Sequence, residues 1–151
     1  MSNYLHCQES NSKILSENDS LYIKAIEDYI VEHEKNPNKY IPKNKQQKVL
    51  YIEGLDCVFD LPKSIMGYEL VFVWPTNQVE CFKKNDGHLL VLEICPLSIE
   101  NKRFDIGINE FYAKMIKRKK KYLRIGMATR AYFNYVNGKL IHFKTEFGGV
   151  Y

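Results

Sequence analysis

The chain has 151 residues, of which 45% are hydrophobic and 26% are charged, a composition that excludes a disordered chain. The length fits one domain, and no stretch approaches the ~18 apolar residues of a membrane span. The net charge of +4 is local, because seven cations lie within residues 114–124. The rest of the chain has 15 Lys and Arg and 18 Asp and Glu, and is therefore net acidic. Any electrostatic partner is therefore expected to bind at this run.

The N-terminal residues and the cysteines give no sign of export. Residues 1–20 contain no apolar signal-peptide core, so we expect a cytoplasmic protein. The chain has four cysteines without any CxxC spacing: Cys7, Cys57, Cys81 and Cys95. The last three lie among apolar residues, where a reduced, buried thiol is the expected state. The sequence predicts neither a metal site nor a cofactor.

The N-terminal part predicts one helix. Residues 1–15 are polar and carry little pattern, and a single domain is expected over residues 16–151. Ser16 and Asp19 match the start of a capped helix. An apolar stripe with helical spacing follows, formed by Tyr22, Ala25, Ile26, Tyr29, Ile30 and His33. Asn36-Pro37 ends this predicted helix, because the residue before a proline disfavours the α conformation.

After a polar linker the hydrophobic period changes from about 3.6 residues to about 2, which is typical of strands. The pattern predicts strands over residues 48–53, 55–59, 68–74, 79–82 and 89–94. Gly54, between the first two, is expected to form a bulge or turn. Pro96 lacks a ladder donor, so an interruption is expected directly after the strand over 89–94.

The last third of the chain predicts a long, bent hairpin. Two apolar sets have opposite parity, namely Phe104, Ile106 and Ile108, and then Phe111, Ala113 and Met115. A one-residue bulge near Asn109 would bring both sets onto one face of the sheet. The cationic run forms the next turn, and a strand over residues 123–135 follows. Asn137-Gly138 predicts a type I′ turn before a closing strand over residues 140–147.

This order of elements predicts an α+β fold in which one N-terminal amphipathic helix packs on a curved antiparallel β-meander. It resembles the cystatin-like and nuclear-transport-factor-2-like folds. About the last 60 residues also resemble a set of uncharacterised bacterial proteins, through Ile94-Cys95-Pro96-Leu97 and Gly148-Gly149-Val150. That resemblance implies no known activity. True cystatins insert a Gln-x-Val-x-Gly hairpin into a protease, and Tyr51 stands at the glycine position here, so protease inhibition is not expected.

No common nucleotide-binding, hydrolase or metalloprotease motif occurs, so an enzyme site would have to be assembled by the fold. Four side chains are candidates for a small-molecule or catalytic pocket in the concave sheet: Asp56, His88, Glu93 and Tyr68. An inward Asp56 could act as a general base. The alternative for Asp56 is a solvent-facing carboxylate, and for His88 and His142 a rim histidine bonded to the backbone.

The cationic run has three interpretations. It is a solvated turn whose like charges oppose edge-to-edge association, a nucleic-acid site with stacking tyrosines, or a site for an acidic protein. We expect a non-enzymatic binding module, and prefer the protein partner because the rest of the chain is net acidic. The expected partner-binding residues are Lys114, Lys117, Arg118, Lys119, Lys120, Lys121, Arg124, Tyr112 and Tyr122. An exposed sheet edge could also support a homodimer.

Overall fold

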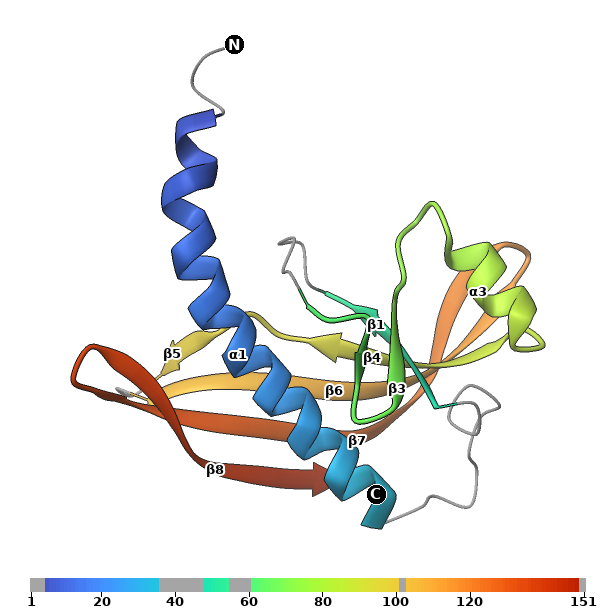
Figure 1. The fold of residues 1–151 in the computed structure, drawn as a ribbon. Helices are drawn as coiled ribbons and strands as arrows, with labels where there is room; N and C mark the ends of the chain where they lie inside the picture. The colour runs from blue at the N-terminus through green and yellow to red at the C-terminus, as the bar shows by residue number, and fades with distance from the viewer. Residues whose placement is uncertain (1–4, 36–47, 55–60, 101–102, 150–151) are drawn as a thin grey trace.

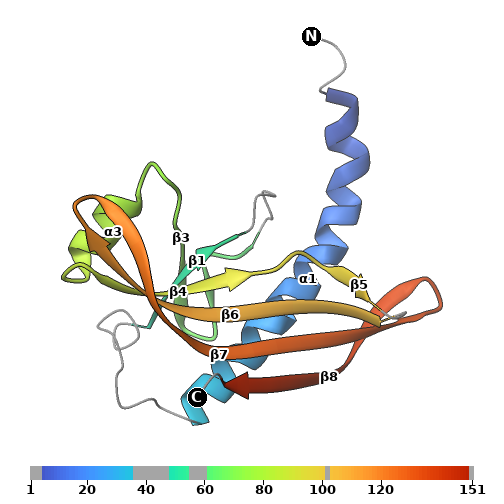
Figure 2. The ribbon, with the colours of Figure 1, turned by 180° about the vertical axis from the view of Figure 1, so that it is seen from behind.

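The computed structural model describes residues 5–35, 48–54, 61–100 and 103–149, with the backbone alone for residues 5–18. One long helix, α1 (Leu5–Lys35), lies across a strongly curled sheet (Figures 1 and 2). The predicted α+β class is confirmed, and the arrangement is compatible with a cystatin-like or nuclear-transport-factor-2-like fold. No helix in the described part of the chain has the length and apolar character needed to cross a membrane.

The sheet is mostly antiparallel. Its strands are β1 (Val49–Glu53), β2 (Ser64–Ile65), β3 (Tyr68–Phe72), β4 (His88–Ile94), β5 (Ser98–Glu100), β6 (Arg103–Ile116), β7 (Lys119–Val136) and β8 (Lys139–Gly149). They lie in the order β2-β3-β1-β4-β6-β7-β8, and β5 also pairs with β6. The predicted strand over residues 55–59, which contains Asp56, lies outside the described residues.

One part of the sheet differs from the predicted meander, because β1 is parallel to both β3 and β4. Since β3 and β4 flank β1 and run in the same direction, the chain must cross over between them. A short helix, α3 (Gln78–Lys84), makes this crossover and buries Cys81 and Phe82. The strand predicted over residues 79–82 is therefore wrong. Its apolar residues form the buried side of a helix, which parallel crossovers commonly use.

The predicted apolar stripe of α1 fills the concave face of the sheet. Ala25, Ile26 and Tyr29 have no exposed surface, and they belong to one cluster with Leu92 and Ile94 of β4. Burial of this stripe is the main stabilising contact between the helix and the sheet. The side chains of α1 therefore occupy the concave face, where the sequence left a small-molecule or catalytic pocket open as an alternative.

The helix begins earlier than predicted, at Leu5 and not near Ser16. No glycine or proline occurs within residues 5–35, so nothing in the sequence interrupts the helix. Once the C-terminal half is fixed by packing, each further residue adds one backbone hydrogen bond without a new nucleation step. The N-terminal turns extend beyond the sheet (Figure 1).

The two apolar sets of β6 lie on opposite faces of the sheet. Ile106 and Ile108 pack in the cluster under α1, whereas Ala113 and Met115 pack in a second cluster with Phe82 of α3. The prediction that one bulge brings both sets onto one face is therefore wrong. Alternation along β6 therefore serves two cores, one under α1 and one at the other end of the strand, where α3 packs.

Register shifts bend the β6–β7 hairpin. One lies between Asn109 and Phe111, where a bulge was predicted, and a second follows directly after Tyr112. Such irregularities increase the local twist of an antiparallel pair. At its far end β7 continues into β8 through Asn137-Gly138, whose φ angles of +48° and +79° confirm a turn that needs left-handed residues at both positions.

Candidate partner-binding surface

The β6–β7 hairpin ends in a turn made of Lys117 and Arg118. Both have left-handed backbone conformations, with φ of +48° and +63°. This conformation destabilises a residue other than glycine by about 1–2 kcal/mol, and such turns favour Asn and Gly. The Asn137-Gly138 turn of the same sheet uses that favoured pair. A cationic turn that lowers the stability of its own hairpin is a feature typical of functional sites.

Five cations at this end of the hairpin are exposed and have neither an ion pair nor a contact with an aromatic ring of another described residue. We name this group the basic tip: Lys114, Lys117, Arg118, Lys119 and Lys121. Lys114 and Lys121 are direct partners across β6 and β7, which places two like charges opposite one another. Because no carboxylate of the described fold neutralises these cations, their field extends into solvent.

Two other cations of the run are engaged within the protein. Lys120 Nζ lies 2.5 Å from Glu53 Oε1 and 4.9 Å from the centre of the Tyr122 ring. Burial opposes the charge of Lys120, but its hydrogen bonds to Glu53 and Tyr122 raise its pKa. Arg124 lies 5.1 Å from the centre of the Tyr112 ring. Lys120 and Arg124 therefore support the hairpin and are not part of the basic tip.

Glu53 fixes the base of the hairpin to β1. Its second oxygen accepts a hydrogen bond of 2.8 Å from the Tyr122 hydroxyl. The Tyr122 ring also packs on Phe111, with ring centroids 5.1 Å apart. Since Glu53 shares a face with Tyr51, which packs on the α3 side, β7 curls over the face opposite α1. The basic tip is thus presented on a supported base.

The basic tip lies beside α3 (Figures 1 and 2), and this neighbourhood extends its charge. Lys83, in the last turn of α3, is exposed and forms no ion pair with a described residue. His88 is exposed and pairs with Lys114 across β4 and β6. Lys83 is far from the cationic run in the sequence, and only the pairing of β4 with β6 brings the two together.

Apolar side chains are exposed next to the basic tip. Leu123 is 54% exposed, Ile125 is 45% exposed and Ile116 is 43% exposed. Exposure of these aliphatic side chains to water is unfavourable, and a turn that is only solvated does not require it. Cations combined with exposed aliphatic side chains are more typical of an interaction surface.

The two tyrosines expected to stack on bases both contact side chains of the hairpin, and Tyr122 keeps 48% of its surface exposed. Arg124 covers the Tyr112 ring, and Lys120 and Phe111 contact the Tyr122 ring. Less aromatic surface is therefore left for stacking on nucleic-acid bases.

The four pocket candidates do not form one site. Asp56 lies outside the described residues. His88 is exposed and contacts the backbone oxygen of Asp86 at 3.1 Å, and Glu93 is exposed at the opposite end of β4. Tyr68 is buried under α1, where its hydroxyl donates to Glu34 over 3.3 Å. Burial and the nearby carboxylate of Glu34 raise the pKa of Tyr68.

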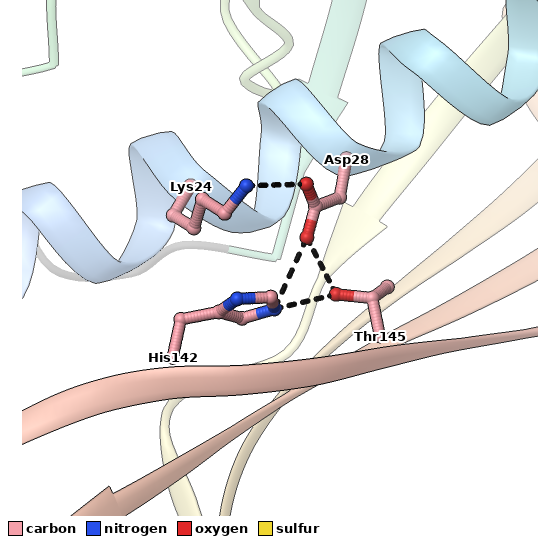
Figure 3. Close-up of polar contacts among 4 residues, drawn as sticks. All are labelled: Lys24, Asp28, His142 and Thr145. Carbon is pink, nitrogen blue, oxygen red and sulfur yellow. Dashed lines mark hydrogen bonds and ion pairs between the residues drawn. The ribbon is translucent and has the colours of Figure 1, made fainter.

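A polar cluster joins α1 to β8 (Figure 3). Asp28 accepts from Lys24 over 2.7 Å and from the Thr145 hydroxyl over 2.5 Å. His142 Nε2 lies 3.2 Å from Asp28 and 2.8 Å from Thr145. A nucleophilic relay needs the acid on one ring nitrogen and the hydroxyl on the other, and here both face the same nitrogen. The cluster therefore ties the last strand to the helix.

A buried carboxylate lies between α1 and the hairpin. Glu110 is 3% exposed, accepts from the Tyr29 hydroxyl over 2.6 Å and from the Met127 amide over 3.1 Å, and faces His33 Nδ1 at 3.6 Å. Burial and the Glu110 charge raise the pKa of Tyr29. Sequence reasoning missed this group, although Glu110 continues the parity of Ile106 and Ile108.

An open groove of about 620 Å³ crosses the face of the sheet opposite α1. Its floor includes Gly107 and Ala128, and its polar groups include Asp105, which is 6% exposed and accepts from Ser98 over 3.1 Å. Cys95 lines one wall as a free, half-buried thiol, and burial raises its pKa. A thiol that is held neutral is a poor nucleophile.

Within the described ranges, no three His, Cys, Asp or Glu side chains gather as metal ligands would. Comparison of the chain with models of known protein families, with curated proteins and with solved structures finds no match.

Proposed function

We propose that this chain is a non-enzymatic binding module whose basic tip binds an acidic surface of a protein partner. The observation that carries the proposal is a set of five exposed cations, without ion pairs in the described fold, around the left-handed Lys117-Arg118 turn. An acidic partner would relieve the repulsion between Lys114 and Lys121, which face each other across the strands. The cystatin-like or nuclear-transport-factor-2-like resemblance is proposed on architecture alone and adds no function.

Two features favour a protein over a nucleic acid. The tyrosines of the hairpin already contact Arg124, Lys120 and Phe111. Leu123 and Ile125 expose aliphatic surface next to the tip, which a protein surface can cover and a phosphate backbone cannot.

The test is affinity capture from a lysate of the native host, with and without nuclease, in the reducing buffer that a cytoplasmic location implies. The tip variant carries Lys117→Glu and Lys119→Glu. The control carries Lys63→Glu and Lys139→Glu, two exposed lysines elsewhere, and has the same net charge. We expect the tip variant to lose at least about tenfold in affinity and the control to retain its partner. Equal retention by both variants would refute the proposal, and capture that nuclease abolishes would assign the tip to nucleic acid.

Small-molecule binding is a second candidate function, favoured by the groove opposite α1. The groove combines a buried carboxylate, Asp105, with an exposed guanidinium, Arg130, whose Nε lies 4.0 Å away. A thermal-shift screen of amino acids and other zwitterions tests it. Stabilisation that is lost in Asp105→Asn would support this second function, and no stabilisation by any compound would remove it.

A further inference from the structure

Strand β7 is longer than the strand that covers its outer edge. β8 pairs with residues 127–136 of β7. In the described part of the chain, residues 119–122, 124 and 125 pair only with β6, and Leu123 and Gly126 lie at the register shifts of that pair. Figure 2 shows β7 continuing past the end of β8 toward the hairpin tip. We name residues 119–126 the open edge.

The open edge carries main-chain groups suited to another strand. In an antiparallel pair, alternate residues direct their N–H and C=O groups away from the neighbouring strand. Along the open edge these groups face away from β6, where no described strand accepts them. Extended peptides bind such edges by adding a strand, with main-chain hydrogen bonds for affinity and side-chain contacts for specificity.

The side chains of the open edge define the partner. Lys119 and Lys121 lie on one face of β7 with exposed charges, and Leu123 and Ile125 are about half exposed. Lysines and register shifts commonly protect an edge against association, but exposed leucine and isoleucine do not. An added strand fits best when it places carboxylates beside the lysines and aliphatic groups beside Leu123 and Ile125.

We infer that the acidic partner binds as an extended strand on the open edge, in line with β8. The inference rests on the proposed function, because it concerns the same surface and the same acidic partner. A second copy of this chain is a poor occupant. A symmetric antiparallel pairing centred near Leu123 would bring Lys121 of one copy beside Arg124 of the other, and like charges opposite one another destabilise a strand pair.

The experiment uses the full chain and two labelled peptides. The first is acetylated Glu-Val-Glu-Val-Glu-Val-Glu amide, which alternates acidic and aliphatic residues. The second has the same side chains but N-methyl groups on alternate amides, which remove donors on one edge and leave the charge unchanged. Fluorescence anisotropy measures affinity, and hydrogen exchange with mass spectrometry measures protection of residues 119–126.

We expect the N-methylated peptide to bind at least about tenfold more weakly than its parent, and only the parent to protect the open edge. Lys119→Glu with Lys121→Glu should abolish binding of the parent. Equal binding of both peptides would overturn strand addition and leave charge-based docking, the proposed function, intact. Binding of neither peptide would also overturn strand addition, and the lysate capture would decide the proposed function separately.

Discussion

Replacement of Tyr29 by Phe removes the hydroxyl that donates to Glu110 and leaves the packing of the ring in place. Tyr29 is 0% exposed and Glu110 is 3% exposed, so water does not replace the lost donor. A hydrogen bond to a charged group contributes about 1.5–3 kcal/mol, and Glu110 keeps the Met127 amide as a donor. We therefore expect the free energy of unfolding to fall by about 2 kcal/mol and the melting temperature by about 4–8 °C.

Urea denaturation followed by circular dichroism measures this loss. Tyr135→Phe is the matched control, because that side chain is 65% exposed and should change stability by less than about 0.5 kcal/mol. A double-mutant cycle with Glu110→Gln should show coupling between the two positions of about 1 kcal/mol or more. A Tyr29→Phe loss as small as that of the control, or strict additivity in the cycle, would contradict the role given to this hydrogen bond.

Four further results are expected. Replacing Lys117-Arg118 by Asn-Gly should raise the free energy of unfolding by about 1–2 kcal/mol in urea denaturation and weaken partner capture, because it removes both the left-handed strain and two tip charges; unchanged stability would argue against strain in this turn. Glu53→Gln should speed hydrogen exchange in residues 119–126, since it removes the charge that holds the hairpin base; unchanged exchange would show that the base is held by other contacts. The raised pKa of Tyr29 means that the folded state favours the neutral phenol. The stability that this phenol contributes is full below about pH 10 and is lost as pH rises through the folded-state pKa. In urea denaturation at alkaline pH, Tyr29→Phe should therefore lose less stability than the wild type, and an identical pH profile would count against this linkage. Asp28→Asn should lower the free energy of unfolding by about 0.5–1.5 kcal/mol and speed exchange in residues 139–149, and protection equal to that of the wild type would count against its role in holding β8.

The parts of the fold predicted from the sequence are those that local periodicity controls. The helical stripe around Tyr29, the Asn137-Gly138 turn and the irregularity near Asn109 all depend on residues close in the chain. The position of β1 between β3 and β4 depends on residues far apart in the chain. Parallel pairing requires a crossover connection, and the hydrophobic period of the strands does not show where that connection places them. The short helix at residues 78–84 was missed since seven residues give too few turns for a helical period to be recognised.

The candidate site was predicted in part. The cationic run is visible in the sequence, but the sequence does not show that Lys120 and Arg124 are used internally, because their partners Glu53 and Tyr112 are brought near by the curl of β7. The open edge was equally hidden, since it depends on where β8 ends relative to β7. A run of cations in the sequence locates a charged surface. The tertiary contacts then determine which of those cations remain available to a partner.

The packing of α1 also constrains the order in which this protein can assemble during synthesis. The helix is translated before the strands that it contacts, and several of those strands are made much later. Tyr29 bonds to a residue 81 positions further along the chain, and Asp28 to one 117 positions further. The hairpins of β6, β7 and β8 are local and can form quickly, whereas the helix has to wait for them. A nascent chain therefore keeps the apolar stripe of α1 uncovered until β6, β7 and β8 have left the ribosome, and during that interval the stripe is exposed to chaperones.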